Sequence, residues 1–168
     1  MSRTVSAVAA LGLALGTVVA LAPSAAAEER ACRGSIGAVT LDNVRVPAGY
    51  TCTLTGTVLK GTLKVEKGAT LTATRVRVNG NVQAEGHRFV TLTSSAVGGS
   101  VQLTQGGGTT LRSNRVKGDV QLFTNRSGTK TVSYNTIDGN LQCKENVPAP
   151  VGTGNVVGGN KEDQCRRL

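Results

Sequence analysis

Gly80-Asn-Val-Gln-Ala84, Gly99-Ser-Val-Gln-Leu103 and Gly118-Asp-Val-Gln-Leu122 are consecutive copies of one motif, spaced 19 residues apart. Four related copies begin elsewhere in the chain, at Asp42, Gly61, Gly139 and Gly159. The seven motif starts are separated by 19, 19, 19, 19, 21 and 20 residues. A repeat of about 20 residues is typical of a solenoid, in which each copy forms one turn that packs on its neighbours.

The residues two and four positions after each motif start are apolar in nearly every copy, as Val101 and Leu103 show. This alternation predicts a strand with one buried face. The residue between them faces outward, and stacking of the copies turns it into a ladder that stabilises the coil. The ladder is expected to contain Lys64, Gln83, Gln102, Gln121 and Gln142.

Two further segments of each copy also place apolar residues inward. One lies two residues before the motif start and comprises Leu59, Val78, Val97, Val116, Ile137 and Val157. The other runs from Cys52 and Leu54 in the first copy to Lys130 and Val132 in the fifth, where the charged Lys130 fits least well. We therefore expect an all-β, single-domain parallel β-helix of about seven turns with a roughly triangular cross-section. Crossovers between parallel strands are usually right-handed, which favours a right-handed coil.

The corners of the expected coil also carry a pattern. Asn114, Asn135 and Asn155 each lie four residues before a motif start, which predicts a buried ladder of hydrogen-bonded amides. Extra residues fall near 125–128 and in the proline-containing stretch 146–154, where we expect protruding loops.

The first 27 residues have the features of a secretory signal peptide. Arg3 precedes an apolar run from Val5 to Ala22, and Ala25-Ala26-Ala27 supplies the small residues of a cleavage site. We expect residues 28–168 to form the mature solenoid domain, with repeats over about 36–165, and to be secreted. The mature chain has no apolar segment long enough for a membrane span.

Removing Arg3 leaves 18 basic and 10 acidic residues, so the mature chain carries a charge of about +8. Anionic cell-wall polymer or polysaccharide is a more natural partner of such a secreted basic protein than nucleic acid, and the alternative is that the charge only forms a diffuse, solvated surface. Nucleic acid is not expected, because binding sites for it normally add stacking aromatic side chains, and the chain has only two Tyr and two Phe. The oligomeric state is left open.

Four cysteines form two pairs separated by about one repeat: Cys32 with Cys52, and Cys143 with Cys165. Each pair should therefore lie on neighbouring turns, within reach of a disulfide. Two bridges at the ends of the coil suit an exported chain. A zinc site is the alternative, but no Cys-x-x-Cys occurs and the chain has a single histidine.

Threonines recur at two outward positions of the upstream strand. They form a candidate binding face made of Thr53, Thr55, Thr72, Thr74, Thr91, Thr93, Thr110 and Thr131. The array resembles the ice-binding face of solenoid antifreeze proteins, although Arg112 interrupts its second row. The alternative is that threonine is simply favoured on exposed β-strands and makes cross-strand contacts there.

Basic residues gather just before several motif starts. They form a candidate anion-binding stripe of Arg75, Arg77, Arg112, Arg115 and Lys117. The stripe suits an anionic polymer, whereas the alternative is that it discourages aggregation of one rod with another.

No arrangement of residues predicts catalysis, a cofactor or a metal. Polysaccharide-degrading enzymes need clustered carboxylates, and the best candidates here are Asp119 and Asp138. Asp138 is expected to form a surface ion pair with Lys117, the residue below it in the stack. His87, between Gly86 and Arg88, is expected to be a solvated loop residue.

The turn between motifs, as in Val65-Glu-Lys-Gly-Ala-Thr-Leu-Thr72, resembles that of bactofilin-like right-handed β-helices and of small secreted bacterial β-helix proteins. The resemblance implies architecture rather than activity. Bactofilins polymerise end to end in the cytoplasm and lack disulfides, and bridged ends would oppose such stacking here. The sequence therefore favours a secreted, non-enzymatic structural or cell-surface interaction module, with polysaccharide binding or degradation and ice binding as alternatives.

Overall fold

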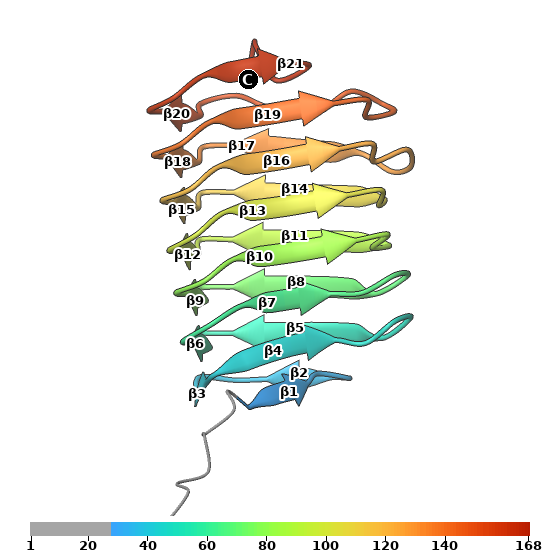
Figure 1. Ribbon diagram of the computed structural model, residues 1–168, viewed down its shortest axis with the longest axis vertical. Coiled ribbons are helices and arrows are strands. Elements are labelled where there is room, and N and C mark those ends of the chain that lie inside the picture. The colour runs from blue at the N-terminus through green and yellow to red at the C-terminus, as the bar shows by residue number, and fades with distance from the viewer. Residues whose placement is uncertain (1–27) are drawn as a thin grey trace, which may run out of the picture.

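The computed structural model describes residues 28–168, which form a coil of parallel strands without any helix in this range (Figure 1). From the N-terminus upward, the chain runs to the right along the near strands and to the left along the far strands, so the coil is right-handed (Figure 1). The all-β solenoid predicted from the repeat is confirmed. The predicted signal peptide, residues 1–27, lies outside the described residues.

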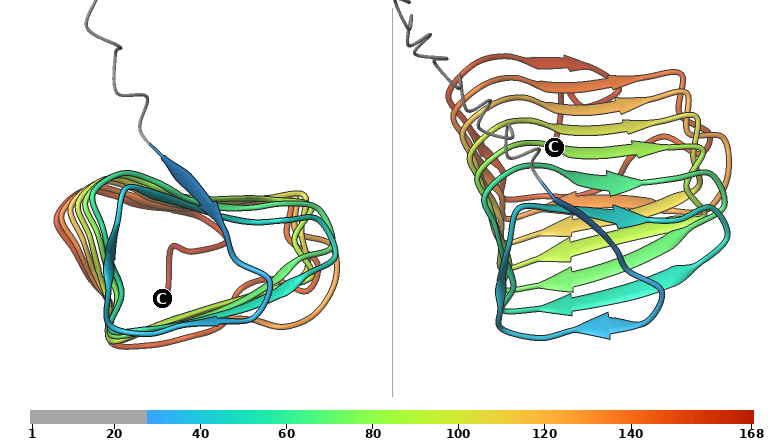
Figure 2. Two further views of the ribbon diagram at one scale, coloured as in Figure 1. Left: turned by 90° about the horizontal axis from the view of Figure 1, so that it is seen from below. Right: turned by 60° about the horizontal axis from the view of Figure 1, so that its bottom comes forward.

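Three sheets form the sides of the coil, and each sheet takes one strand from most turns, except that the last turn joins sheet B only through an isolated bridge between Thr131 and Val151. Sheet A contains β1 (Glu29–Ala31), β4 (Asn43–Val46), β7 (Leu63–Val65), β10 (Val82–Glu85), β13 (Val101–Thr104), β16 (Val120–Phe123), β19 (Leu141–Lys144) and β21 (Lys161–Asp163). Sheet B contains β2 (Ser35–Ile36), β5 (Thr51–Thr55), β8 (Thr70–Thr74), β11 (Phe89–Thr93), β14 (Gly108–Arg112) and β17 (Lys130–Ser133). Sheet C contains β3 (Thr40–Leu41), β6 (Val58–Leu59), β9 (Arg77–Val78), β12 (Ala96–Val97), β15 (Arg115–Val116), β18 (Thr136–Ile137) and β20 (Val156–Val157). Seen along its axis, the rod has a roughly three-sided outline (Figure 2).

Equivalent residues of successive turns lie directly above one another. Val82, Val101 and Val120 are register partners in sheet A, and Gln83 pairs in the same way with Gln102. The predicted amide ladder is present: successive glutamine side chains are joined by hydrogen bonds of 3.1, 3.2 and 2.9 Å. Vertical register of identical side chains is therefore the organising feature of the fold.

The interior is filled by the predicted columns of valine, leucine and isoleucine. Leu54, Leu92 and Leu122 are each 0% exposed, and no tryptophan is needed to fill so narrow a core. Lys130, the residue that fitted the inward column least well, nevertheless points inward and is 0% exposed. Its aliphatic stem occupies core volume while its Nζ donates a hydrogen bond to the Val147 carbonyl, 2.7 Å away.

The predicted asparagine ladder lies at the corner between sheets B and C. The backbone N–H of Asn114 donates to Oδ1 of Asn135 at 3.0 Å, and that of Asn135 donates to Oδ1 of Asn155 at 3.1 Å. Each side-chain amide also donates to a carbonyl of the turn below, as Asn135 does to Leu111 at 2.9 Å. Backbone N–H and C=O groups at the corner, which have no partner within a sheet, are thereby hydrogen-bonded inside the protein.

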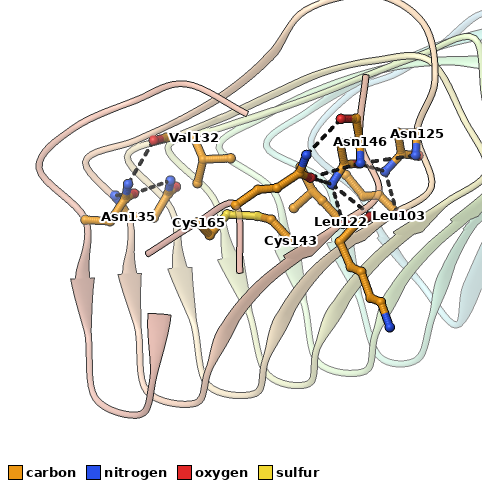
Figure 3. Close-up of a disulfide and its surroundings, with 11 residues drawn as sticks. Leu103, Leu122, Asn125, Val132, Asn135, Cys143, Asn146 and Cys165 are labelled. Atoms are coloured by element: carbon orange, nitrogen blue, oxygen red, sulfur yellow. Dashed lines mark hydrogen bonds between the residues drawn. A yellow bond between two sulfur atoms is a disulfide. The ribbon is translucent and has the colours of Figure 1, made fainter. Parts of the chain in front are cut away.

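A second ladder, absent from the sequence prediction, lies at the corner between sheets A and B. It contains Asn125, Asn146 and Gln164, with backbone-to-side-chain hydrogen bonds of 3.2 and 2.9 Å (Figure 3). Asn125 and Asn146 are buried, so the extra residues near them are not wholly protruding loops as predicted. The exposed parts are residues 126–129 and 147–149, with 151, 153 and 154.

Two disulfides join neighbouring turns at opposite ends of the rod, as predicted. Cys32 is bonded to Cys52 with 5.6 Å between their Cα atoms, and Cys143 is bonded to Cys165 with 5.2 Å (Figure 3). After Cys165 the chain turns back toward the rod axis, and Leu168, 9% exposed, packs against the core (Figure 2). A terminal turn has a neighbour on only one side, so these links lie where the coil is weakest.

We expect the Cys32→Ala/Cys52→Ala protein to lose about 3 kcal/mol of unfolding free energy, because the bridge closes a loop of about 20 residues in the unfolded chain. Denaturant unfolding with and without the bridge measures this difference. An unchanged unfolding midpoint in the doubly substituted protein would show that the first turn is held by its sheet pairing alone.

Candidate functional site

The corner between sheets B and C has an outer edge of residues in the left-handed backbone region. Arg75, Ser94, Ser113 and Tyr134 have φ angles of 53°, 51°, 56° and 56°. Such angles are unfavourable for residues other than glycine. Here the residue after each of them donates its backbone N–H to a corner side chain of the next turn, which holds the bend. All four side chains are exposed, so the corner presents them to solvent in a vertical row.

A shallow groove runs along this corner and gathers part of the predicted anion-binding stripe. Arg75, Arg77 and Arg115 line it, together with Tyr134. Asn114, a member of the buried ladder, also lines the groove. No acidic side chain is among the residues that line the groove. The groove therefore has a positive edge on a rigid base.

The other two stripe residues lie beside the groove rather than in it. Arg112 projects from β14, and its guanidinium lies 5.3 Å from the centre of the Tyr134 ring. Lys117 is not among the lining residues. The predicted ion pair between Lys117 and Asp138 is wrong. Oδ1 of Asp138 lies 3.8 Å from Nη2 of Arg115 instead, because Arg115, two residues before Lys117 on the turn below, lies nearer the corner.

The threonine face is the outer surface of sheet B. Thr53, Thr72, Thr91, Thr110 and Thr131 form one unbroken column, as the strand register shows. A second column holds Thr55, Thr74 and Thr93 and then changes to Arg112 and Ser133. Sequence reasoning missed a third column, which begins with Thr51, Thr70 and Phe89.

Both aspartates considered for catalysis have structural partners. Oδ1 of Asp119 accepts a hydrogen bond of 2.7 Å from the Asn140 backbone at the corner between sheets C and A. Asp138 has Arg115 as its partner. Within residues 28–168, no three His, Cys, Asp or Glu side chains are grouped so as to hold a metal ion.

His87 is buried, at 2% exposed, so the prediction of a solvated loop residue is wrong. Its Nε2 lies 3.4 Å from Oγ1 of Thr109, and its Nδ1 has no partner. Gly106 follows one turn later, where a β-carbon would overlap the imidazole ring. The missing side chain at Gly106 therefore makes room for His87 at the corner between sheets A and B.

Burial, together with the positive charge of Lys130, lowers the pKa of His87 to about 4. Burial also lowers the pKa of Lys130. The spacing of the repeat did indicate that the core around His87 and Lys130 is polar. Thr109 and Lys130 occupy the inward position filled by Leu71 and Val90 in earlier turns, which indicates a polar pocket inside the core.

Asn125-Arg-Ser127 matches an N-glycosylation acceptor. The Asn125 side chain is fully buried, and its amide nitrogen donates to the Leu103 carbonyl at 2.9 Å and to Oδ1 of Asn146 at 3.0 Å. Both amide hydrogens are therefore used inside the fold, and the folded protein does not offer this asparagine for modification.

No protein-family model matches the chain, and no similar curated protein or solved structure was found. Among residues 28–168 there is also no helix with the length and apolar character needed to cross a membrane. Function is therefore inferred from the surfaces of the rod.

We expect acid to destabilise the protein through His87. In the unfolded chain the imidazole takes up a proton near pH 6.5, whereas in the folded protein it resists protonation until about pH 4. The unfolding free energy should therefore fall as the pH drops between these values, by about 3 kcal/mol in total. Denaturant unfolding at several pH values measures this change.

The control for this prediction is His87→Gln, which keeps a polar side chain near Thr109 but cannot titrate. The difference in unfolding free energy between the two proteins should vary with pH from 6.5 down to 4 and be constant above about pH 7.5. A difference that is independent of pH would contradict the assignment of this acid sensitivity to His87.

Proposed function

We propose that this chain is a secreted, non-catalytic β-solenoid that acts as an interaction module at the cell surface and binds an anionic polymer along the corner between sheets B and C. The observation that carries the proposal is the groove lined by Arg75, Arg77 and Arg115 without a single acidic side chain. A linear polymer with repeated negative charges matches a row of guanidinium groups on a straight corner.

The geometry of the groove supports an extended ligand. Arg77 and Arg115 occupy equivalent positions two turns apart in sheet C, with Ala96 between them. Rungs are about 4.8 Å apart, so these positions are separated by about 10 Å along the axis. The small Ala96 leaves the space between the arginines open. Tyr134, 53% exposed, adds a phenol hydroxyl that can hydrogen-bond to a ligand.

The two disulfides suit an oxidising location outside the cell, and they agree with the predicted signal peptide. The non-catalytic part of the proposal is supported by Asp119, whose carboxylate is used as a structural acceptor at a corner. A polysaccharide-degrading activity would need a free pair of carboxylates, and the two candidates are each held by another partner.

The test is binding to immobilised polyglycerol phosphate, a phosphate polymer that stands in for anionic cell-wall material. We expect salt-sensitive retention of the wild-type protein and about a tenfold or greater loss of affinity in Arg75→Gln/Arg77→Gln/Arg115→Gln. The matched control is Lys144→Gln/Arg166→Gln/Arg167→Gln, which removes the same charge from exposed positions at the C-terminal end. Equal losses in the two triple variants, or no retention of the wild type, would contradict the proposal.

The threonine face supports a second candidate function, ice binding. Over β5, β8 and β11 the outer surface of sheet B is a three-by-three array of eight threonines and Phe89, without a charged side chain. Regular rows of hydroxyl and methyl groups about 4.8 Å apart form a flat, rigid lattice. Arg112 ends the array at the next turn.

Ice binding would appear as thermal hysteresis and as inhibition of ice recrystallisation by the purified protein. Thr72→Lys, at the centre of the array, should abolish both effects, whereas Thr131→Lys, outside the three-by-three array, should leave most of them. If the wild-type protein changes neither the freezing point nor ice growth, this second candidate is wrong.

A further inference from the structure

A surface hollow on sheet A takes no part in the anionic-polymer proposal. It has a volume of about 840 Å³, and Lys64, Gln83, Gln102 and Gln121 of the amide ladder line it. These residues belong to β7, β10, β13 and β16, which face the viewer in Figure 1. The hollow therefore follows the rod axis over four turns.

Hydrogen bonding within the ladder fixes the direction of every glutamine. Nε2 of Gln83 donates to Oε1 of Gln102, Nε2 of Gln102 donates to Gln121, and Nε2 of Gln121 donates to Gln142. The series ends where Gln142 donates to the Glu162 carboxylate at 2.9 Å. All amides therefore point the same way and are held in place before any ligand arrives.

The ladder leaves part of each amide unused. A glutamine side chain has two N–H donors and two acceptor positions on its oxygen. Gln102 uses one donor upward and one acceptor downward within the ladder. One donor and one acceptor per rung remain, and they repeat about every 4.8 Å along the axis.

The charges around the hollow cancel. Lys64 and Lys67 are matched by Glu66 and Glu85, and the remaining polar lining consists of amides and the hydroxyl of Thr104. No aromatic ring lines the hollow. This balance disfavours a strongly charged ligand, and it distinguishes the hollow from the arginine groove on the other side of the molecule.

We propose that the hollow over the glutamine ladder binds a neutral, hydroxyl-rich glycan lying along the rod axis. A sugar hydroxyl is both donor and acceptor, so it complements the unused donor and acceptor of a glutamine. The length of one sugar residue in an extended glycan is close to the spacing between successive turns, so successive sugars meet successive glutamines. The site is separate from the groove at the corner between sheets B and C, and it stands whether or not that groove binds an anionic polymer.

The test uses neutral hexasaccharides of three kinds, from cellulose, xylan and chitin, added to the isotopically labelled wild-type protein. We expect at least one of them to shift the side-chain amide signals of Gln83, Gln102 and Gln121 in NMR spectra. The Gln83→Ala/Gln102→Ala protein should then bind that sugar about tenfold more weakly, because two rungs of the complementary surface are lost.

Gln142→Ala is the matched control, since Gln142 belongs to the same ladder but does not line the hollow. It removes only the acceptor that orients Gln121, so it should weaken sugar binding far less than Gln83→Ala/Gln102→Ala does. Equal weakening in the two variants would show that the ladder acts only on stability, and this result would overturn the proposal. So would the absence of any glutamine amide shift with all three sugars, an outcome that the wild-type spectra decide whether or not the variants fold.

Discussion

The structure depends on how a parallel solenoid supplies hydrogen-bond partners for the backbone N–H and C=O groups at its corners. Within a strand each N–H and C=O finds a partner in the turn above or below, but a bend removes some groups from that pattern. Here asparagine and related side chains supply the missing partners. Asn114 and Asn135 do so between sheets B and C, Asn125 and Asn146 between sheets A and B, and Asn81 and Asp119 between sheets C and A. Each bridge spans one turn, so it fixes the vertical register as well as the bend.

Fixed register explains the character of the surfaces. Because equivalent residues lie above one another, each exposed position becomes a straight column, and several of these columns repeat one kind of side chain. Sheet A presents glutamines, sheet B presents threonines, and the corner between sheets B and C presents arginines and hydroxyl groups. Linear polymers and regular lattices are the ligands that match straight columns, and the proposed functions follow from this geometry.

The sequence predicted the three-sided coil, the two disulfides and the asparagine ladder because these depend on spacing alone. It did not predict the environment of His87, which depends on the room left by Gly106 one turn later. The sequence likewise predicted the burial of Lys130 only weakly, because a charged residue conflicts with the inward position that the strand register assigns to it. The grouping of Arg75, Arg77 and Arg115 without Lys117 depends on where a corner bends, and the repeat does not specify this.

The most direct test of the account is the measurement of NMR scalar couplings across backbone hydrogen bonds of sheet C. The stacked register requires couplings from the Asn79 N–H to the Leu59 carbonyl, from Gly98 to Val78 and from Lys117 to Val97, each one turn back. Detection of this series would confirm that the turns are stacked in register. Couplings to other carbonyls, shifted by one or more residues or lying within the same turn, would contradict it.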